Sequence, residues 1–377
     1  MSVYEINLPL FSLEVKMPKI KAAVAHEFGK PLKVEEVILR SPIKNEVEVT
    51  LGAVAICHSD ISYMEGAWGG FLPAVYGHEA SGEVSNVGEN IEDISIGDRV
   101  VVTLIRSCGE CINCKQGKPT LCLFEYDGTK GPLKTLGGDE LMQAMACGAF
   151  AEKVVVDKSQ VVKISEKISY ETAALMACGV ITGIGAVVNA AKIKPGQDVV
   201  VIGAGGVGLN AIQGARLAGA RRILAVDLSE EKLKVATEFG ATDGVLSTCR
   251  SPWKLVKEKL GGGADAVFVS VGIASVYDTA PLYLGPGGQV VMLGMTKTSD
   301  LSTFKPVNLA ALSQKMIGSK MGDTVISRDI PWIADLYLQS RLKLDELISK
   351  RWTLKQINEA VLDTKTGSAK RNLIVFN

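Results

Sequence analysis

The fold is decided by the stretch Asp198-Val-Val-Val-Ile202-Gly203-Ala-Gly205-Gly206-Val207-Gly208. A short β-branched run leads into Gly-x-Gly-x-x-Gly, and the apolar spacing of residues 206–218 then predicts a helix. In such a unit the first glycine permits a tight turn, the second lets the backbone approach a pyrophosphate, and the third lets helix and strand pack closely. The helix N-terminus faces the anion. We therefore expect a dinucleotide-binding loop at 203–208; glycines that serve turn geometry alone are the alternative.

A carboxylate ends the next expected strand, 222–226. Asp227 stands where a side chain can hold the ribose hydroxyls of an adenosine, and its charge repels a 2′-phosphate. The sequence thus favours NAD over NADP. A plain strand-end role for Asp227 is the alternative.

Beyond about residue 170, helical and strand patterns alternate. Repeated units of this length predict a parallel sheet with helices on both faces, a doubly wound Rossmann domain over 181–322. The expected helices are 171–191, 206–218, 230–239 and 274–284, and the expected strands are 198–202, 222–226, 266–270 and 289–293.

The first half of the chain has a different pattern. Short β-branched segments separated by turns predict a β-rich domain over 1–180, with strands at 20–25, 46–55, 82–87, 99–103 and 150–156. A helix at 331–340 and a strand at 371–376 suggest that 323–377 returns to that domain. We expect residues 1–16 to form a surface extension.

Composition excludes several classes of partner. The 377 residues include 41 basic and 41 acidic side chains, and no basic stripe supports a nucleic-acid or anionic-membrane partner. The early Glu5 argues against a secretory signal. The apolar stretch 173–188 is shorter than the roughly 20 residues a membrane span needs, so a buried helix fits it better. We expect a cytoplasmic protein.

Four cysteines gather in a short lobe, about 106–124. Four thiolates complete a tetrahedral zinc shell and leave no open position, so such a site braces a loop. A pair of disulfides is the alternative, which the lack of any sign of secretion disfavours. The quartet is Cys108, Cys111, Cys114 and Cys122.

A second, scattered set consists of Cys57, His78 and Cys178. Three ligands from distant segments leave one zinc position open for water or substrate, which is the catalytic pattern. Ordinary core side chains are the alternative. We interpret Cys147 and Cys249 as free thiols without a metal.

With these motifs in place, the chain resembles the zinc-containing, medium-chain alcohol dehydrogenase family from about Lys19 onward. The resemblance implies that the β-rich domain is GroES-like. It is carried, in order, by Cys57-His58-Ser59-Asp60, Gly77-His78-Glu79-Ala-Ser-Gly82, the quartet, Cys178-Gly-Val-Ile-Thr182-Gly, and Gly203–Gly208.

The resemblance also implies a role for each site residue. The catalytic zinc would bind Cys57, His78 and Cys178, with Glu79 as an occasional ligand. Asp60 would accept the second ring proton of His78, and the Ser59 hydroxyl would bond the substrate oxygen. The cofactor would be contacted by the glycine loop and Asp227, by His58 and Arg371 at the pyrophosphate, by Lys232 at the ribose, and by Thr182.

Differences between this chain and related enzymes of the family narrow the class of possible substrates. Polyol dehydrogenases have a Glu as third ligand where this chain has Cys178, so a sugar alcohol is disfavoured. Glutathione-dependent formaldehyde dehydrogenases carry two acids in the loop corresponding to 68–70 and an Arg where this chain has Tyr126. Instead, Trp68, Leu104 and Met145 would line an apolar pocket suited to a medium-sized alcohol or aldehyde.

The leading hypothesis is a zinc-dependent alcohol dehydrogenase that uses NAD and holds two zinc ions per chain. An S-(hydroxymethyl)glutathione dehydrogenase is the alternative among enzymes, and a silent zinc- and nucleotide-binding redox reporter is the alternative outside them. The segment from Cys122 to Cys178 is similar in length to that of dimeric family members, so the resemblance implies a homodimer. We expect it to be joined through the nucleotide domains, by edge strands around Gln289–Met295. Ser62 stands where several relatives have a proton-relaying His.

Overall fold

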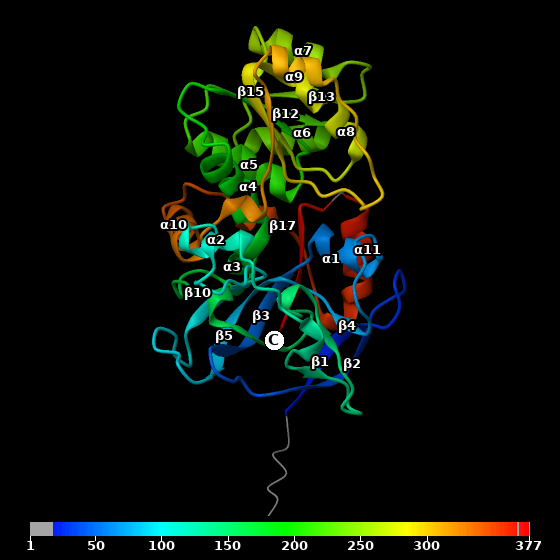
Figure 1. The fold of residues 1–377 in the computed structure, drawn as a ribbon, viewed down its shortest axis with the longest axis vertical. Coiled ribbons are helices and arrows are strands. Elements are labelled where there is room, and N and C mark those ends of the chain that lie inside the picture. Colours follow the sequence, from blue (N-terminus) through cyan, green and yellow to red (C-terminus); the bar gives the residue numbers. More distant parts are fainter. Residues whose placement is uncertain (1–17, 368, 377) are drawn as a thin grey trace, which may run out of the picture.

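The computed structural model describes residues 18–367 and 369–376, so the expected extension at 1–16 lies outside the described residues. Two parts are stacked along the long axis of the molecule (Figure 1). The upper part contains β11 to β16 and their helices, and the lower part contains the remaining strands.

The upper part is a six-stranded parallel sheet in the order β13-β12-β11-β14-β15-β16. This is the 3-2-1-4-5-6 order of a doubly wound dinucleotide-binding domain, which confirms the predicted Rossmann fold. The strands are β11 (Asp198–Ile202), β12 (Arg222–Asp227), β13 (Asp243–Leu246), β14 (Ala264–Val269), β15 (Leu284–Met292) and β16 (Lys315–Gly318). The helices are α5 (Gly206–Leu217), α6 (Glu230–Glu238), α7 (Pro252–Leu260), α8 (Ala274–Thr279) and α9 (Pro306–Ala311).

The edge of this sheet differs from the expected one. Strand β15 pairs with β14 on one side and β16 on the other, so Gln289–Met295 does not form an edge and that part of the dimer prediction is wrong. The edge strand on this side of the sheet is β16. Its sequence, Lys-Met-Ile-Gly, is too short and mixed to give a clear strand pattern.

The lower part contains two sheets, ordered β7-β2-β1-β4-β8 and β10-β6-β5-β3-β18-β17, with β9 also paired to β3. Because β18 pairs with β3 and β17, the last strand of the chain completes a sheet begun by the first domain. The strands are β1 (Lys19–Ala25), β2 (Lys33–Leu39), β3 (Glu46–Ala55), β4 (Ala74–Val75), β5 (Glu79–Val87), β6 (Arg99–Thr103), β7 (Leu133–Lys134), β8 (Met142–Gln143), β9 (Lys153–Asp157), β10 (Val161–Lys163), β17 (Ile348–Trp352) and β18 (Arg371–Val375). Helices α1 (His58–Met64), α2 (Ile112–Lys115), α10 (Ile326–Leu338) and α11 (Ile357–Lys365) accompany them.

A long apolar helix joins the two parts. It consists of α3 (Tyr170–Leu175), a π turn (Met176–Val180), α4 (Ile181–Gly185) and a second π turn (Ala186–Ala190). Length and composition would allow Tyr170–Ala190 to cross a membrane, but 83% of its apolar window is buried inside the protein. The segment is a core helix, as the sequence predicted.

Helix α10 begins five residues earlier than expected. The expected helix, 331–340, would begin at Pro331, a position that a proline ring tolerates. The helix instead starts at Ile326 and contains Pro331, and Ile326, Ile330 and Ile333 are buried in the core. Burial of that apolar face outweighs the one backbone hydrogen bond that proline cannot donate.

Candidate active site

Four side chains from three distant segments converge at the junction of the two parts. One ligand atom from each of Cys57, His78, Glu79 and Cys178 lies within 4.8 Å of all the others, and all four residues are buried. Cys57 precedes α1, His78 and Glu79 lie at the start of β5, and Cys178 lies in the first π turn of the long helix. Widened turns of this kind occur often at functional sites.

Asp60 organises this cluster from behind. Its Oδ2 accepts the backbone N–H of Cys57 at 3.0 Å, and its Oδ1 accepts that of Gly77 at 3.0 Å. Oδ1 also lies 2.9 Å from His78 Nδ1, and because a carboxylate can only accept, Nδ1 carries the proton of this hydrogen bond. His78 Nε2 is buried and has no hydrogen-bond partner among residues 18–367 and 369–376. The Nε2 atom is therefore free to coordinate a metal beside the two cysteine sulfurs.

The two buried thiols are electrostatically unequal. A hydrogen bond from Cys178 holds the pKa of Cys57 well below its usual range, with burial opposing this and His78 assisting. The same hydrogen bond, together with burial, raises the pKa of Cys178 well above its usual range. Burial raises the pKa of Glu79 to about 8, against the attraction of Arg371.

Arg371 connects this cluster to the glycine loop. Its Nη1 donates to Glu79 Oε1 at 3.2 Å, and both side chains are buried. A Cβ placed on Gly206 would lie 2.6 Å from Arg371 Nε, so the guanidinium lies against the start of α5. Within the part of the chain that the structure describes, Arg371 Nη2 and Glu79 Oε2 are buried without hydrogen-bond partners. The cation therefore keeps an unused donor beside the loop expected to bind pyrophosphate.

The glycine loop has the geometry that its sequence requires. Gly203 has a φ of +93°, and a Cβ on Gly208 would lie 1.8 Å from the Gly203 carbonyl oxygen. Asp227 ends β12, and its Oδ2 accepts the N–H of Ala204 at 2.8 Å while its Oδ1 accepts that of Ser229 at 3.2 Å. The carboxylate thus lies directly beside the loop.

Sequence reasoning missed Met321, which follows β16. Its Sδ lies 3.7 Å from Cys178 Sγ and 3.8 Å from Thr182 Oγ1, so one thioether contacts a residue of each expected site. Three successive residues, 321–323, have positive φ. Only Gly322 could have signalled this turn from sequence.

The structure contains an apolar cavity of about 110 Å³, and one of its lining residues is Tyr76, two positions before His78 in the sequence. Burial, assisted by Asp60, raises the pKa of Tyr76 to about 12, so its hydroxyl is neutral. The cavity is lined by Tyr63, Gly70, Phe71, Tyr76, Met142, Ala144 and Met145.

Of the three residues expected to line such a pocket, only Met145 does so. The Trp68 ring stands edge-on against Tyr63 with centroids 5.0 Å apart, and its Nε1–H donates to the Thr296 carbonyl at 2.8 Å, which draws it towards the Rossmann domain. Leu104 is partly buried and packs against the two larger cores. Trp68 and Leu104 are thus not among the residues lining this particular cavity, and their place in the substrate pocket stays a prediction.

The remaining expected residues have varied positions. Ser59 Oγ lies 3.7 Å from Cys57 Sγ, in reach of the cluster. His58 is exposed at the start of α1, and Lys232 lies in the first turn of α6. Val207 is partly exposed at the start of α5.

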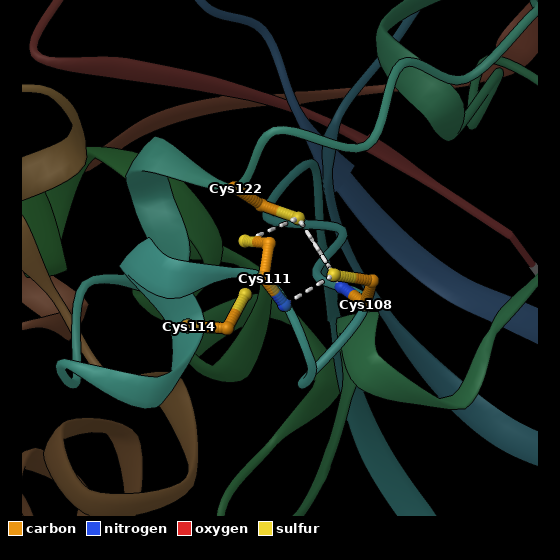
Figure 2. Close-up of side chains that lie close together, drawn as sticks. All are labelled: Cys108, Cys111, Cys114 and Cys122. Atoms are coloured by element: carbon orange, nitrogen blue, oxygen red, sulfur yellow. Dashed lines mark hydrogen bonds between the residues drawn. The ribbon is translucent and has the colours of Figure 1, made fainter.

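The cysteine quartet forms a separate cluster at the surface. Figure 2 shows the four side chains pointing toward one another, with Cys114 on the short helix α2. Their ligand atoms also lie within 4.8 Å of one another. Backbone N–H groups of Cys108, Cys111 and Phe124 donate to quartet sulfurs at 3.3–3.4 Å, which favours thiolates. All eight cysteines of the chain are free thiols, so the disulfide alternative is wrong.

These contacts give the thiols of the quartet different pKa values. Backbone hydrogen bonds lower the pKa of Cys111 to about 6, and backbone hydrogen bonds also lower that of Cys108. Burial and the neighbouring sulfurs raise the pKa of Cys114 to about 12. The set is closed, with four sulfurs and no fifth position, and this is the donor set of a structural zinc.

Comparison with known proteins agrees with this geometry. The model of the alcohol dehydrogenase GroES-like domain matches residues 43–166, and that of the zinc-binding dehydrogenase domain matches 206–339. The NDMA-dependent alcohol dehydrogenase of Amycolatopsis methanolica is 33% identical over 95% of this chain and 99% of its own length. The S-(hydroxymethyl)glutathione dehydrogenase of Synechocystis is 33% identical over 95% of this chain and 100% of its own. The crystal structure of benzyl alcohol dehydrogenase from Acinetobacter calcoaceticus superposes with a TM-score of 0.89 at 28% identity, covering 96% of this chain and 100% of that one.

Fold and sites together define a zinc-binding dehydrogenase built from a GroES-like and a Rossmann domain. The chain belongs to the zinc-containing, medium-chain alcohol dehydrogenase family, an enzyme family whose members interconvert small alcohols and carbonyl compounds with zinc and a nucleotide cofactor.

Proposed function

We propose that the protein is an NAD-dependent alcohol dehydrogenase whose catalytic zinc binds Cys57, His78 and Cys178, with Glu79 as an occasional ligand. The observation that carries this proposal is the His78 Nε2 atom, which is buried beside two thiols and has no hydrogen-bond partner among the described residues. An uncompensated buried lone pair is costly, and a metal bound there would satisfy it. We propose a second, structural zinc in the quartet.

The donor set fits an open zinc position, and zinc would supply Lewis acidity that polarises a substrate oxygen. Asp60 holds the His78 ring in one tautomer, so that Nε2 stays available. The Ser59 hydroxyl, beside Cys57, would hydrogen-bond the substrate oxygen and accept its proton while passing its own proton on to water. The apolar cavity beyond Tyr76 would exclude water and hold the hydrocarbon part of the substrate.

For the cofactor, we propose that the glycine loop, His58 and Arg371 bind the pyrophosphate, that Asp227 and Lys232 hold the adenosine ribose, and that Thr182 contacts the nicotinamide half. The orphaned Nη2 of Arg371 beside Gly206 supports its role. We keep the division into 1–180, 181–322 and 323–377 as the domain proposal.

Replacing Asp227 by glycine, with an Arg introduced at 228, should shift preference from NAD towards NADP. The carboxylate that excludes a 2′-phosphate is then gone and a cation replaces it. We expect the ratio of kcat/KM values for the two cofactors to change by more than about a hundredfold. Removing the carboxylate and adding the cation should each change the relative binding free energy by roughly 1–2 kcal/mol. The shift is measured by initial rates with both cofactors.

Two outcomes would contradict the cofactor proposal. The unmodified protein using NADP as readily as NAD would refute the role of Asp227. One relative is an NDMA-dependent alcohol dehydrogenase, so NDMA should also be tested as the electron acceptor. Turnover with NDMA in the absence of added NAD and NADP would refute the proposal that NAD is an exchangeable acceptor.

The substrate class is our proposal too: a medium-sized, apolar alcohol. The apolar lining of the cavity supports it, as does the relative that acts on benzyl alcohol. The relative that acts on S-(hydroxymethyl)glutathione keeps that substrate as the second candidate. Rates for a panel of alcohols, and for formaldehyde with and without glutathione, would separate the two. A protein inactive with all of them would instead fit the silent redox reporter, whose weakness is that it needs no open metal position.

Ser62 leads to a prediction about the proton. A hydroxyl cannot act as a base near neutral pH, so the proton should leave Ser59 through water. Oxidation should then speed up into alkaline pH and with added amine buffers. Ser62→His should raise the rate at neutral pH by about tenfold and weaken the buffer dependence; this is less than the roughly 10²- to 10⁴-fold of a full general-base contribution, because water already carries the proton. No effect of buffer or of Ser62→His would mean either that the relay interpretation is wrong or that cofactor release limits turnover. A primary isotope effect with deuterated alcohol would then distinguish these two explanations.

We propose a homodimer that forms through the Rossmann domains. The exposed edge of β16 supports this, since an edge strand offers unpaired backbone groups to a second copy. Sedimentation should show a dimer, and Ile317→Pro, which blocks edge pairing, should give monomers. A tetramer or a monomer in the unmodified protein would refute the proposal. We also propose a cytoplasmic location, which the eight free thiols support.

A further inference from the structure

The wall of the apolar cavity contains a backbone conformation that residues with side chains rarely adopt. Met145 and Ala146, in the turn after β8, have φ values of 51° and 55°. Left-handed backbone is uncommon for such residues, and two in succession persist only where the surroundings hold them in place. Ala144 and Met145 both line the cavity, so this turn sets its shape.

Gln143 holds the turn from its start. The side chain is 1% exposed. Its Nε2 donates to the carbonyl of Cys147 at 3.0 Å, across the turn, and to that of Val155 at 2.8 Å in β9. Its Oε1 accepts the hydroxyl proton of Tyr126 at 2.6 Å. The amide therefore spans the turn and fastens it to the neighbouring strand.

Gln160 holds the turn at its centre. It is fully buried, and its Nε2 donates to the carbonyl of Ala146 and to that of Thr103, both at 2.9 Å. The same nitrogen lies 3.5 Å from Cys147 Sγ. One amide group thus connects the second left-handed residue to strand β6.

The far end of the turn is fixed to the segment that carries His78. The N–H of Ala149 donates to the Gly77 carbonyl at 2.9 Å, and that of Phe150 to the Tyr76 carbonyl at 2.7 Å. With both ends fixed, the left-handed pair is the part of the turn that can relax. Relaxation to ordinary φ values would carry the Met145 side chain away from the cavity wall.

We propose that Gln143 and Gln160 are positioning residues that hold Met145 against the cavity and thereby set which size of alcohol the enzyme prefers. The inference rests on the proposed function, since it takes the cavity as the site of the substrate's apolar group. Neither glutamine lines the cavity. Both act through the backbone of the turn.

The test uses Gln160→Met, which keeps the length of the side chain and removes both N–H donors. Rates are measured for ethanol, butanol, hexanol and benzyl alcohol. Binding of each alcohol is measured separately through the change in intrinsic fluorescence of the four tryptophans, of which Trp68 contacts the lining residue Tyr63. The preference of the best-fitting alcohol over ethanol should fall by about tenfold or more, since one methylene in an apolar pocket is worth about 10- to 200-fold. The loss should appear in KM, with kcat for ethanol nearly unchanged.

Two further variants separate positioning from mere stability. Gln213→Met is the matched control: Gln213 is equally buried and its amide bonds both backbone groups of Lys343, but it lies in the Rossmann domain. It should lower the Tm without changing the preference. Adding Ala146→Gly to Gln160→Met should restore most of the preference, because glycine adopts positive φ without cost.

Each result of these experiments bears on the proposed role of the two glutamines. An unchanged preference in Gln160→Met, or a double variant that regains Tm but not preference, would overturn the inference. An unmodified protein that binds the alcohols without oxidising them would refute the proposed function alone, and the binding preferences would still test the two glutamines. An unmodified protein that neither binds nor oxidises any alcohol would overturn both.

Discussion

Cys57→Ser should abolish alcohol oxidation while leaving a folded protein. The change removes one sulfur from a buried set in which His78 Nε2 has no other partner. We expect turnover to fall by at least about a thousandfold, comparable to the loss of a group that stabilises the transition state. Metal analysis should show one zinc ion lost per chain and one retained.

The matched control is Cys249→Ser, which changes an exposed thiol outside both clusters and should alter neither zinc content nor rate. Thermal unfolding completes the experiment. A Cys57→Ser protein that keeps both zinc ions, or one that fails to fold, would contradict the assignment of Cys57 to an open metal position.

In contrast to Cys57→Ser, the variant Cys111→Ser should destabilise the fold. The quartet is closed and its lobe, 106–124, has little apolar burial, with Ile112, Leu121, Leu123 and Phe124 all exposed. A bound metal would therefore supply most of the free energy that folds it, and its loss should lower the free energy of unfolding by more than about 2 kcal/mol. The expected result is one zinc ion lost, a lower Tm, and early proteolysis within the lobe.

The comparison between the two variants is decisive. If Cys57→Ser and Cys111→Ser destabilise the protein equally, the distinction between an open and a closed site is wrong. If Cys111→Ser retains its Tm after chelation of all zinc, the lobe does not depend on a metal.

Local patterns predicted much of this molecule. The Gly203–Gly208 loop and the quartet each lie within one short stretch, where spacing alone constrains geometry. The strands 46–55, 99–103 and 198–202 also have the expected bounds, since their buried β-branched runs end at clear turns. Cys57, His78 and Cys178 required the family resemblance, because no local signal shows that three distant segments meet.

What the sequence did not reveal depends on long-range contacts. Trp68 is turned by a hydrogen bond to Thr296, from the other domain. Met321 reaches Cys178 only through a left-handed turn, and the positive φ of Met145 depends on Gln143 and Gln160. Such conformations arise from tertiary packing that overrides local preference, so composition and periodicity carry no trace of them.

The pairing of β18 with β3 also has a consequence for biosynthesis. Arg371 and its strand leave the ribosome after the entire Rossmann domain, yet they complete a sheet whose other strands were made first. Until then the nascent GroES-like domain carries an open strand edge at Ala53–Ala55 and a Glu79 without its cation. Vectorial folding therefore cannot finish this domain early, and its exposed edge is where a chaperone would be needed during translation.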